Sequence, residues 1–228
     1  MPQIIGQGVK GKLQTINNLS IQQSNNLRPL LHGIVQGGLY PELREKSAKE
    51  LIALDFDGYS VGGLAVDLET KEMWDIVKLM GEMLPANKQR YLMGVGTPDD
   101  IIKATALGMD MFDCVLPTRL ARHGSVYIKK GVISNVNEKS HEISCLDKSM
   151  ARNDRYLLIN LLNSQYRTDG EVIDENCGCQ ACQHGKGLSR AYISHLLRSN
   201  EILGLRLTTL HNLWQYLHLM KELREVNT

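Results

Sequence analysis

Four short apolar segments that alternate with helical segments constrain the fold of this chain most. The helical segments run over 41–54 and 71–84, and a third begins at Thr97, a natural N-cap followed by Pro98. Glycines or a proline follow the apolar segments, as expected where strands run into loops. Such alternation predicts parallel βα units and an α/β fold. The apolar segments, which we interpret as strands, cover 32–36, 59–61, 91–95 and 109–113.

The number of these units indicates part of a larger architecture. A closed (β/α)8 barrel typically needs ~250 residues and eight units. Only about four units are present before the pattern changes after Asp113. We therefore expect the second half of a TIM-type (β/α)8 barrel, with a helical subdomain appended to it.

The sequence predicts four regions of different character. Residues 1–30 form an atypical leader, possibly disordered, with nine Gln or Asn and no Asp, Glu, His or Cys. The half-barrel covers 31–137 and ends in a hairpin, 125–134, that turns at 129–131. Residues 138–166 are polar, then weakly helical. Residues 167–228 hold two further helices, at 189–203 and 207–223.

Composition restricts the setting in which the protein works. The formal net charge is +1, from 26 Lys and Arg against 25 Asp and Glu, which argues against a general nucleic-acid-coating protein. No secretory signal is recognisable, and the most apolar later stretch, 156–162, is too short to span a bilayer. We expect a cytoplasmic protein without a membrane segment.

A cluster of cysteines is the strongest chemical signal. Cys177, Cys179 and Cys182 lie within six residues of one another, and an odd total of five cysteines favours metal binding over disulfides. A closed structural zinc site needs a fourth ligand. His184 and His211 are both candidates, and His211 is favoured because His184 is cramped against Cys182. The alternative is three core or redox cysteines.

Two weaker patterns lie at the carboxyl ends of the expected strands. Asp113 ends the fourth strand, where barrels keep their chemistry, although it is equally explained as a loop acid or a helix cap. Gln36 and the pairs Gly37-Gly38 and Gly62-Gly63 offer bare backbone and an amide to a planar ligand, or are ordinary tight turns. Basic residues that include Arg119 and Arg122 form either a phosphate-binding patch or a solvated surface.

Together these motifs resemble the second half of bacterial-type tRNA-guanine transglycosylases. The resemblance covers about 31–137 and 168–225, and implies that 138–166 is an insertion. The motifs in chain order are Gly33-Ile-Val-Gln-Gly-Gly38, Tyr59-Ser-Val-Gly-Gly-Leu-Ala-Val66, Tyr91-Leu-Met-Gly-Val-Gly-Thr-Pro98, Met111-Phe-Asp-Cys-Val-Leu-Pro-Thr-Arg119, Cys177-x-Cys-x-x-Cys182, Ser189-Arg-Ala-Tyr192, Glu201-Ile-Leu-Gly204 and His211-Asn212.

The resemblance implies an enzyme of the queuosine pathway that replaces the wobble guanine of a tRNA anticodon by a 7-deazaguanine. Its implied partners are this tRNA, the free base, and a complementary N-terminal half, a second copy of the chain, or both. The implied roles are Asp113 as covalent nucleophile, Gln36, Gly63 and Leu64 as base-pocket residues, Arg119 and Arg122 as tRNA contacts, and Cys177, Cys179, Cys182 and His211 as ligands of a structural Zn²⁺.

Two other functions stay open at this point. The chain is alternatively a non-catalytic, zinc-containing tRNA-binding subunit, or an inactive fragment of such an enzyme. The general acid/base carboxylate that the family carries in its first half is absent here, which is consistent with both. Retention of Asp113 favours an enzyme, because a scaffold has no use for that carboxylate.

Overall fold

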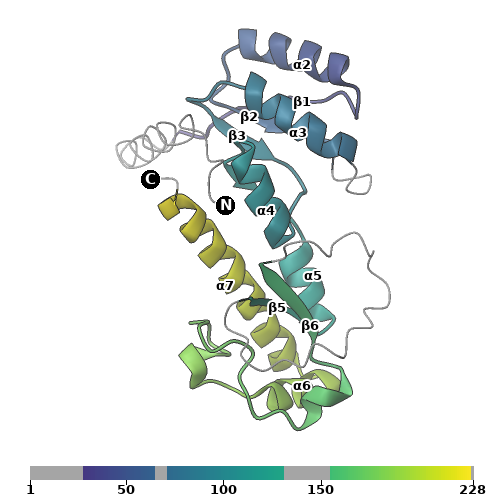
Figure 1. Cartoon of the computed structure of the whole chain (residues 1–228), viewed down its shortest axis with the longest axis vertical. Coiled ribbons are helices and arrows are strands. Elements are labelled where there is room, and N and C mark those ends of the chain that lie inside the picture. Colours follow the sequence, from purple (N-terminus) through teal and green to yellow (C-terminus); the bar gives the residue numbers. More distant parts are fainter. Residues whose placement is uncertain (1–27, 65–70, 131–154, 227–228) are drawn as a thin grey trace, which may run out of the picture. The chain divides into compact units, whose positions relative to one another are not determined.

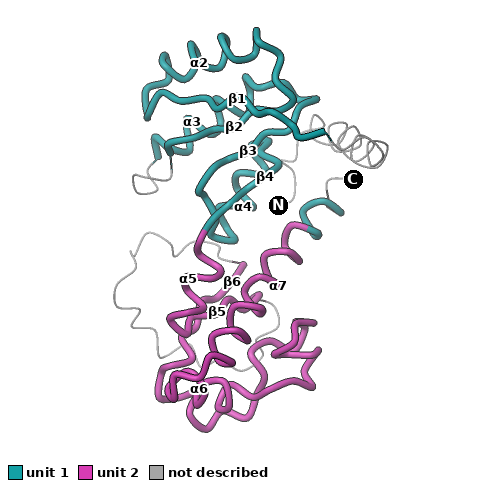
Figure 2. The backbone as a smooth tube through the Cα atoms, turned by 180° about the vertical axis from the view of Figure 1, so that it is seen from behind, with its two compact units in different colours: residues 1–114, 221–228 teal, residues 115–220 magenta. Residues whose placement is uncertain are grey.

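The computed structural model describes residues 28–64, 71–130 and 155–226, shown in colour in Figure 1. The chain divides into two compact units: Met1–Cys114 with Lys221–Thr228, and Val115–Met220 (Figure 2). Most of the leader, the second strand of the expected hairpin and most of the expected insertion lie outside the described residues.

A four-stranded parallel sheet forms the centre of the first unit. Its strands pair in chain order, and each crossover contains one helix, as expected for βα units. The α/β fold with a parallel sheet is thereby confirmed. The elements are β1 (His32–Val35), α2 (Pro41–Ala53), β2 (Gly58–Val61), α3 (Lys71–Met83), β3 (Gln89–Leu92), α4 (Pro98–Ala106) and β4 (Met111–Phe112).

The last two strands are displaced or shortened relative to the prediction. We expected 91–95, but β3 spans Gln89–Leu92, since Gly94 has a positive φ of 76° and turns the chain out of the sheet. We expected 109–113, but the ladder with β3 pairs only Met111 and Phe112. Asp113 therefore lies directly after the end of β4.

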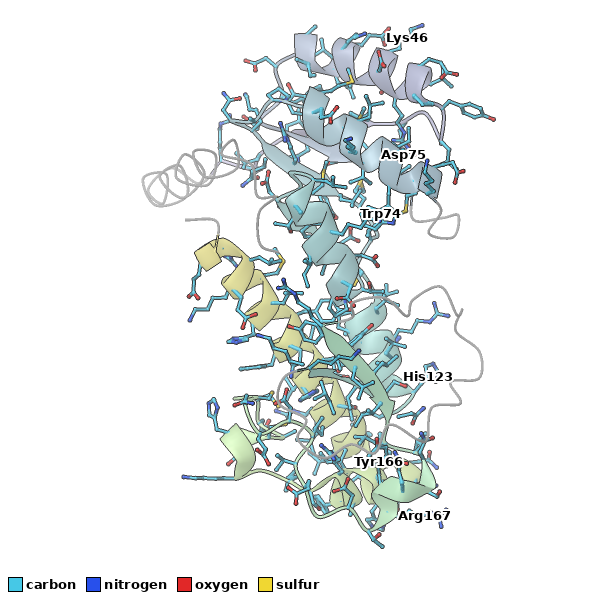
Figure 3. The ribbon with its side chains drawn as sticks, in the orientation of Figure 1. Lys46, Trp74, Asp75, His123, Tyr166 and Arg167 are labelled. Carbon is cyan, nitrogen blue, oxygen red and sulfur yellow. The ribbon has the colours of Figure 1, made fainter. Side chains whose placement is uncertain are left out.

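Apolar side chains of the strands and helices form the core of this unit. All four residues of β2 are buried, and α3 contributes Met73, Ile76 and Met80. Burying each such large apolar side chain is worth roughly 1.5–3 kcal/mol. Helix α4 contacts α3 through the Lys103 ammonium, which lies 3.8 Å from the ring centroid of Trp74. Trp74 is labelled in Figure 3.

The start of α4 follows the prediction closely. The hydroxyl of Thr97 accepts a hydrogen bond from the backbone N–H of Asp100, and the Asp100 carboxylate accepts one from the backbone N–H of Thr97. This capping box satisfies two backbone donors at the helix start. Pro98 occupies the first helical turn, where no intrahelical N–H is needed.

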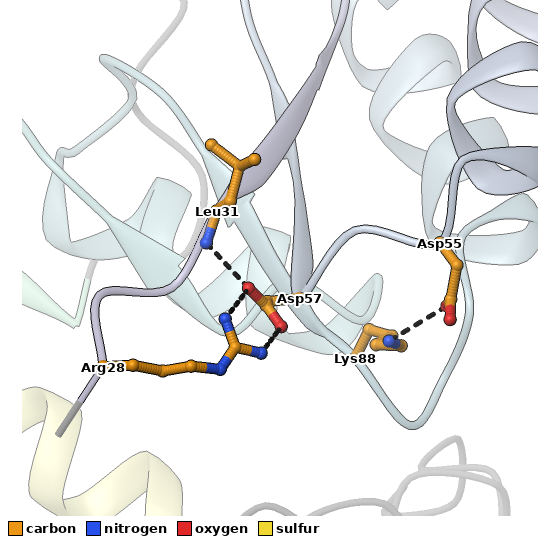
Figure 4. A network of polar contacts seen from close by, with 5 residues as sticks. All are labelled: Arg28, Leu31, Asp55, Asp57 and Lys88. Carbon is orange, nitrogen blue, oxygen red and sulfur yellow. Dashed lines mark hydrogen bonds and ion pairs between the residues drawn. The ribbon is translucent and has the colours of Figure 1, made fainter. Parts of the chain in front are cut away.

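A carboxylate fixes the beginning of β1 at the amino edge of the sheet (Figure 4). Asp57 accepts two hydrogen bonds from the Arg28 guanidinium and one, of 2.9 Å, from the backbone N–H of Leu31. These contacts lower the pKa of Asp57 from 3.8 to about 2, the Arg28 hydrogen bond being the largest cause. The chain segment before β1 is thus tied to the segment before β2.

The second unit combines a two-stranded antiparallel sheet with three α-helices. In its sheet, β5 pairs with β6 along five residues of each strand. Helix α7 continues beyond the unit, because Lys221 and the following residues belong to the first. The elements are α5 (Leu116–Arg122), β5 (Ser125–Lys129), β6 (Tyr156–Asn160), η2 (Ser164–Arg167), η3 (Gln183–Gly185), α6 (Arg190–Arg198) and α7 (Ile202–Val226).

Several local predictions for this unit were wrong. Residues 156–160, expected to be weakly helical, form the strand that pairs with β5. Helix α6 ends at Arg198 rather than 203, because Asn200 adopts a left-handed φ of 56°, and α7 starts at Ile202 rather than 207. None of the helices that the structure describes is long and apolar enough to cross a membrane.

Candidate active site and metal centre

Asp113 lies where the parallel strands of the first unit end. Its side chain is exposed, but one carboxylate oxygen is held firmly. The Tyr91 hydroxyl donates a hydrogen bond of 2.7 Å to Oδ1, and the backbone N–H of Gly94 donates one of 2.8 Å to the same atom. These donors come from β3 and the turn after it, the element next to β4.

This arrangement leaves the second oxygen of Asp113 available. Among the described residues, both hydrogen bonds to the Asp113 carboxylate are accepted by Oδ1, and none is accepted by Oδ2. The carboxylate raises the pKa of Tyr91 to about 12, mainly through the hydrogen bond between them. Tyr91 therefore remains protonated at neutral pH and acts as a permanent donor that orients Asp113.

The ends of β1 and β2 bring Gln36 against a pair of glycines. A Cβ atom on Gly62 would lie 2.6 Å from Nε2 of Gln36, and one on Gly63 would lie 2.7 Å from Oε1. The side-chain amide therefore lies across both glycines, and any larger residue there would displace it. Of the three expected base-pocket residues, the structure brings Gln36 and Gly63 together at the carboxyl edge of the sheet.

Leu64, the third expected pocket residue, has its side chain in the core. It is only 1% exposed. The structure therefore gives a ligand at the sheet edge no access to the isobutyl group of Leu64.

A buried arginine supports the turn that carries Gln36. Arg44, from α2, donates hydrogen bonds of 2.8 Å to the carbonyl oxygens of Gly38 and Val35, on either side of Gln36. Gly37 and Gly38 both have positive φ, at 141° and 59°, which only glycine adopts readily. Arg44 thereby fixes the two ends of a glycine turn that has little rigidity of its own.

The second unit gathers the four expected metal ligands. Their ligand atoms all lie within 4.8 Å of one another, and all four residues are buried. The ring Nδ1 of His211 lies 3.3 Å from Sγ of Cys182 and 3.7 Å from Sγ of Cys179. His211, on α7, is therefore the fourth member. His184 does not belong to the group.

The second ring nitrogen of His211 fixes which atom faces the sulfurs. Nε2 lies 2.7 Å from the carbonyl oxygen of Tyr127. A carbonyl only accepts, so Nε2 carries a proton, and Nδ1 is the ring nitrogen that faces the cysteines and can ligate a metal. A metal-binding histidine ordinarily donates its other N–H in this way.

The donor set suits a soft, tetrahedral ion. Three thiolates and one imidazole match the ligand types of structural zinc sites, whose Zn–S bonds of about 2.3 Å place sulfurs roughly 3.8 Å apart. Hydrogen bonding from Cys177 and Cys182 lowers the pKa of Cys179, so the cluster readily holds a thiolate. An ion bound by all four groups would have no open coordination position, as in structural sites.

The two expected tRNA contacts lie on one short helix. Arg119 and Arg122 are exposed on α5. His123, labelled in Figure 3, is the C-cap residue of this helix. The hydroxyl of Thr118 on the same helix donates its proton to the carbonyl of Val115, so this proton is not offered to a ligand.

Sequence reasoning missed the residues that orient the predicted ones. Tyr91, Arg44 and Asn212 make hydrogen bonds across elements, and no local spacing reveals such partners. The signal that the sequence offered was residue type: an arginine on α2 with no acid three or four residues away, and an asparagine directly after His211.

Comparison with known proteins identifies the family. The family model described as queuine tRNA-ribosyltransferase matches residues 14–226. Proteins named queuine tRNA-ribosyltransferase are similar to this chain: one from Thiobacillus denitrificans is 47% identical over 85% of the chain, and one from Nitrosospira multiformis is 48% identical over 85%. A third, from Thermoanaerobacter sp., is 45% identical over 88%.

The match covers only part of each relative. The chain spans 45% of the length of the Thiobacillus denitrificans and Nitrosospira multiformis proteins and 46% of the Thermoanaerobacter protein. The family match nevertheless extends over most of the chain and includes Asp113, the glycine turns and the Cys3His cluster. This chain belongs to the queuine tRNA-ribosyltransferase family.

Proposed function

We propose that this chain carries the nucleophile and the metal centre of a tRNA-guanine transglycosylase. The reaction replaces the wobble guanine of a tRNA anticodon by a 7-deazaguanine. One observation carries the proposal. Asp113 is exposed at the carboxyl edge of a parallel sheet, where Oδ1 accepts hydrogen bonds from two donors and Oδ2 accepts none from the described residues. The parallel units constitute the second half of a (β/α)8 barrel, which keeps its chemistry at this edge.

The carboxylate performs the exchange in two displacements. Oδ2 of Asp113 attacks C1′ of the ribose while the C1′–N9 bond to guanine breaks, as in a retaining glycosidase. Guanine leaves with a proton from a general acid that the remainder of the enzyme supplies. The incoming base then attacks C1′, releases Asp113 and gives up one proton, so that the configuration at C1′ is retained and the RNA backbone stays intact.

Gln36 and the glycine turn after β2 provide the base pocket. A base must leave the anticodon stack before a nucleophile reaches its C1′, and the pocket must then hold its planar edge. The Gln36 amide offers a donor and an acceptor, while Gly63, which has no side chain and precedes Leu64, allows close approach. Tight packing of the amide against both glycines fixes its direction.

The second unit binds the RNA and is held together by metal. Cys177, Cys179, Cys182 and His211 ligate a structural Zn²⁺, which links the cysteine loop to α7. Arg119 and Arg122 on α5 contact phosphates of the anticodon loop. The two arginines supply charge and position; the reacting atoms are handled by Asp113.

Completion of the active site requires a further polypeptide segment. The edge strands of the described sheet are β1 and β4, and open parallel edges invite pairing with further strands. We propose a complementary N-terminal half, a second copy of the chain, or both as the partner that supplies the acid which protonates guanine.

Base exchange tests this function directly. The chain is mixed with the part of the Thiobacillus denitrificans relative that it does not cover, and incorporation of radiolabelled guanine into tRNA is measured. We expect exchange with both pieces and little with this chain alone, since general acid–base help is worth about 10²–10⁴-fold. Binding of tRNA without exchange, while the intact relative is active, would instead indicate a non-catalytic tRNA-binding subunit.

A further inference from the structure

One buried face of α7 is polar where an apolar stripe is expected. Helices of globular proteins turn apolar residues to the core. Here Thr208, His211, Asn212 and Gln215, spaced as neighbours on one helix face, are each at most 1% exposed. Buried polar groups persist only where hydrogen bonds satisfy them. Each member should therefore have a specific structural partner.

Asn212 connects α7 to two other elements of the second unit. Its Oδ1 accepts a hydrogen bond of 3.0 Å from the backbone N–H of Tyr127 on β5. Its Nδ2 donates one of 3.0 Å to the carbonyl of Pro117 on α5 and one of 3.1 Å to that of Ser125. The amide is oriented unambiguously, since an N–H only donates and a carbonyl only accepts.

The other members of this face do not perform the same task. The hydroxyl of Thr208 has one proton, and the Gly204 carbonyl of its own helix, at 2.9 Å, is nearer than that of Ala121 on α5, at 3.2 Å. Gln215 donates to Oδ2 of Asp174, in the segment that leads to the cysteines. Among these residues, Asn212 is therefore the one whose side chain donates to α5 without a nearer acceptor on its own helix.

Helix α5 depends on such outside contacts. It has only seven residues, and its N-cap residue, Val115, makes no side-chain cap. Helices of this length are not stable by themselves in water. The adjacent His211 sits in the metal cluster, so the backbone that presents Asn212 is anchored at the next residue.

We propose that Asn212 is a positioning residue for RNA binding: its amide holds α5 so that Arg119 and Arg122 present their guanidinium groups together. The inference rests on the proposed function, in which these two arginines contact phosphates. Asn212 itself touches no RNA, and it acts only through the backbone of Pro117 and β5.

A double-mutant cycle tests the proposal. Binding of an anticodon stem-loop RNA is measured by fluorescence anisotropy for wild type, Asn212→Ala, the double variant Arg119→Ala/Arg122→Ala, and the triple variant. Zinc content is determined for each protein. We expect Asn212→Ala to weaken binding about tenfold and to reduce the salt slope by about 0.7 per lost phosphate contact. In the background without the arginines it should have no further effect.

Two further variants separate positioning from general damage. Gln215→Ala removes a buried hydrogen bond from the same helix face, but the partner of that bond is Asp174 and not a residue of α5. It should lower stability and leave RNA binding unchanged. Asn212→Asp keeps the acceptor for Tyr127 and loses the donor to Pro117, so it should reproduce the binding defect if Asn212→Ala fails to fold.

Hydrogen exchange distinguishes this inference from the proposed function. In Asn212→Ala and Asn212→Asp, amides of α5 should lose protection that Gln215→Ala retains, whether or not the wild type binds RNA. Weak RNA binding by the wild type would refute the RNA role of α5. Unchanged α5 protection, or additive effects of Asn212 and the arginines on binding, would overturn the positioning role.

Discussion

The hydroxyl of Tyr91 donates a hydrogen bond of 2.7 Å to Oδ1 of Asp113 and so selects which carboxylate oxygen is free to react. The same contact raises the pKa of Tyr91 to about 12, so the phenol stays protonated at neutral pH and remains a donor. The Gly94 N–H adds a second bond to the same oxygen. A side chain on a neighbouring strand thus orients the proposed nucleophile.

Removing that phenol should slow the first displacement. Tyr91→Phe keeps the ring and deletes the donor, and a hydrogen bond to a charged group is worth about 1.5–3 kcal/mol. We expect formation of the covalent RNA intermediate to slow about 10- to 100-fold in the reconstituted enzyme, with the Kd for tRNA unchanged. Rapid-quench sampling on denaturing gels measures the rate of intermediate formation in wild type and in Tyr91→Phe. An equal rate in Tyr91→Phe would show that the contact does not orient Asp113.

Gly63→Ala should disturb base binding more than stability. The new Cβ would lie 2.7 Å from Oε1 of Gln36, and a φ of 70° adds strain of roughly 1–2 kcal/mol. Gly38→Ala is the matched control, because its φ is 59° but its Cβ would meet only the Tyr40 ring, at 3.6 Å. Both variants should lose similar thermal stability, whereas only Gly63→Ala should raise the KM for guanine strongly. Equal KM values in the two variants would contradict the pocket assignment.

Metal content tests the cysteine cluster. Purified protein should contain about one zinc ion per chain, and Cys179→Ser should lose most of it. Cys114→Ser, which changes a half-buried thiol of the first unit, should retain the full amount. Elemental analysis by mass spectrometry checks both. Folded wild-type protein without metal, or full retention in Cys179→Ser, would exclude the Cys3His centre.

The Arg28–Asp57 contact predicts acid sensitivity. The folded pKa of Asp57, about 2, lies below its ordinary value of 3.8, so the contact stabilises the fold above about pH 4. This contribution is lost as the pH falls from 4 toward 2. Urea denaturation at pH 5 and pH 3 should therefore show a smaller loss of stability in Asp57→Asn than in wild type. A steeper loss in the variant would contradict the assigned direction.

Local signals in the sequence predicted the features that depend on neighbouring residues. Thr97 and Pro98 specified the start of α4, because a capping box needs only residues four positions apart or fewer. The cysteine spacing likewise predicted three members of the Cys3His group, and the need for a fourth ligand favoured His211 over His184, as the structure has it. The parallel order of the strands followed from their alternation with helices.

Features that depend on distant partners were not predictable in the same way. Strand β6 pairs with β5 across the undescribed 131–154 segment, and an apolar stretch such as Tyr156–Asn160 reads equally as helix or strand without its partner. Asn212 resembles an ordinary helix residue until α5 and β5 are packed against it. The short β4 reflects where its ladder with β3 stops, which no single-strand pattern encodes.

Direct observation of the covalent intermediate tests the central claim. The reconstituted enzyme is incubated with tRNA and then resolved on a denaturing gel, for wild type and for Asp113→Asn. Asp110→Asn is the control. Asp110 directly precedes β4, and its carboxylate accepts a hydrogen bond from the backbone N–H of Arg90 on β3, which is a structural role. We predict a slow-migrating protein–RNA band in wild type and Asp110→Asn and none in Asp113→Asn. A band that persists in Asp113→Asn would contradict the account.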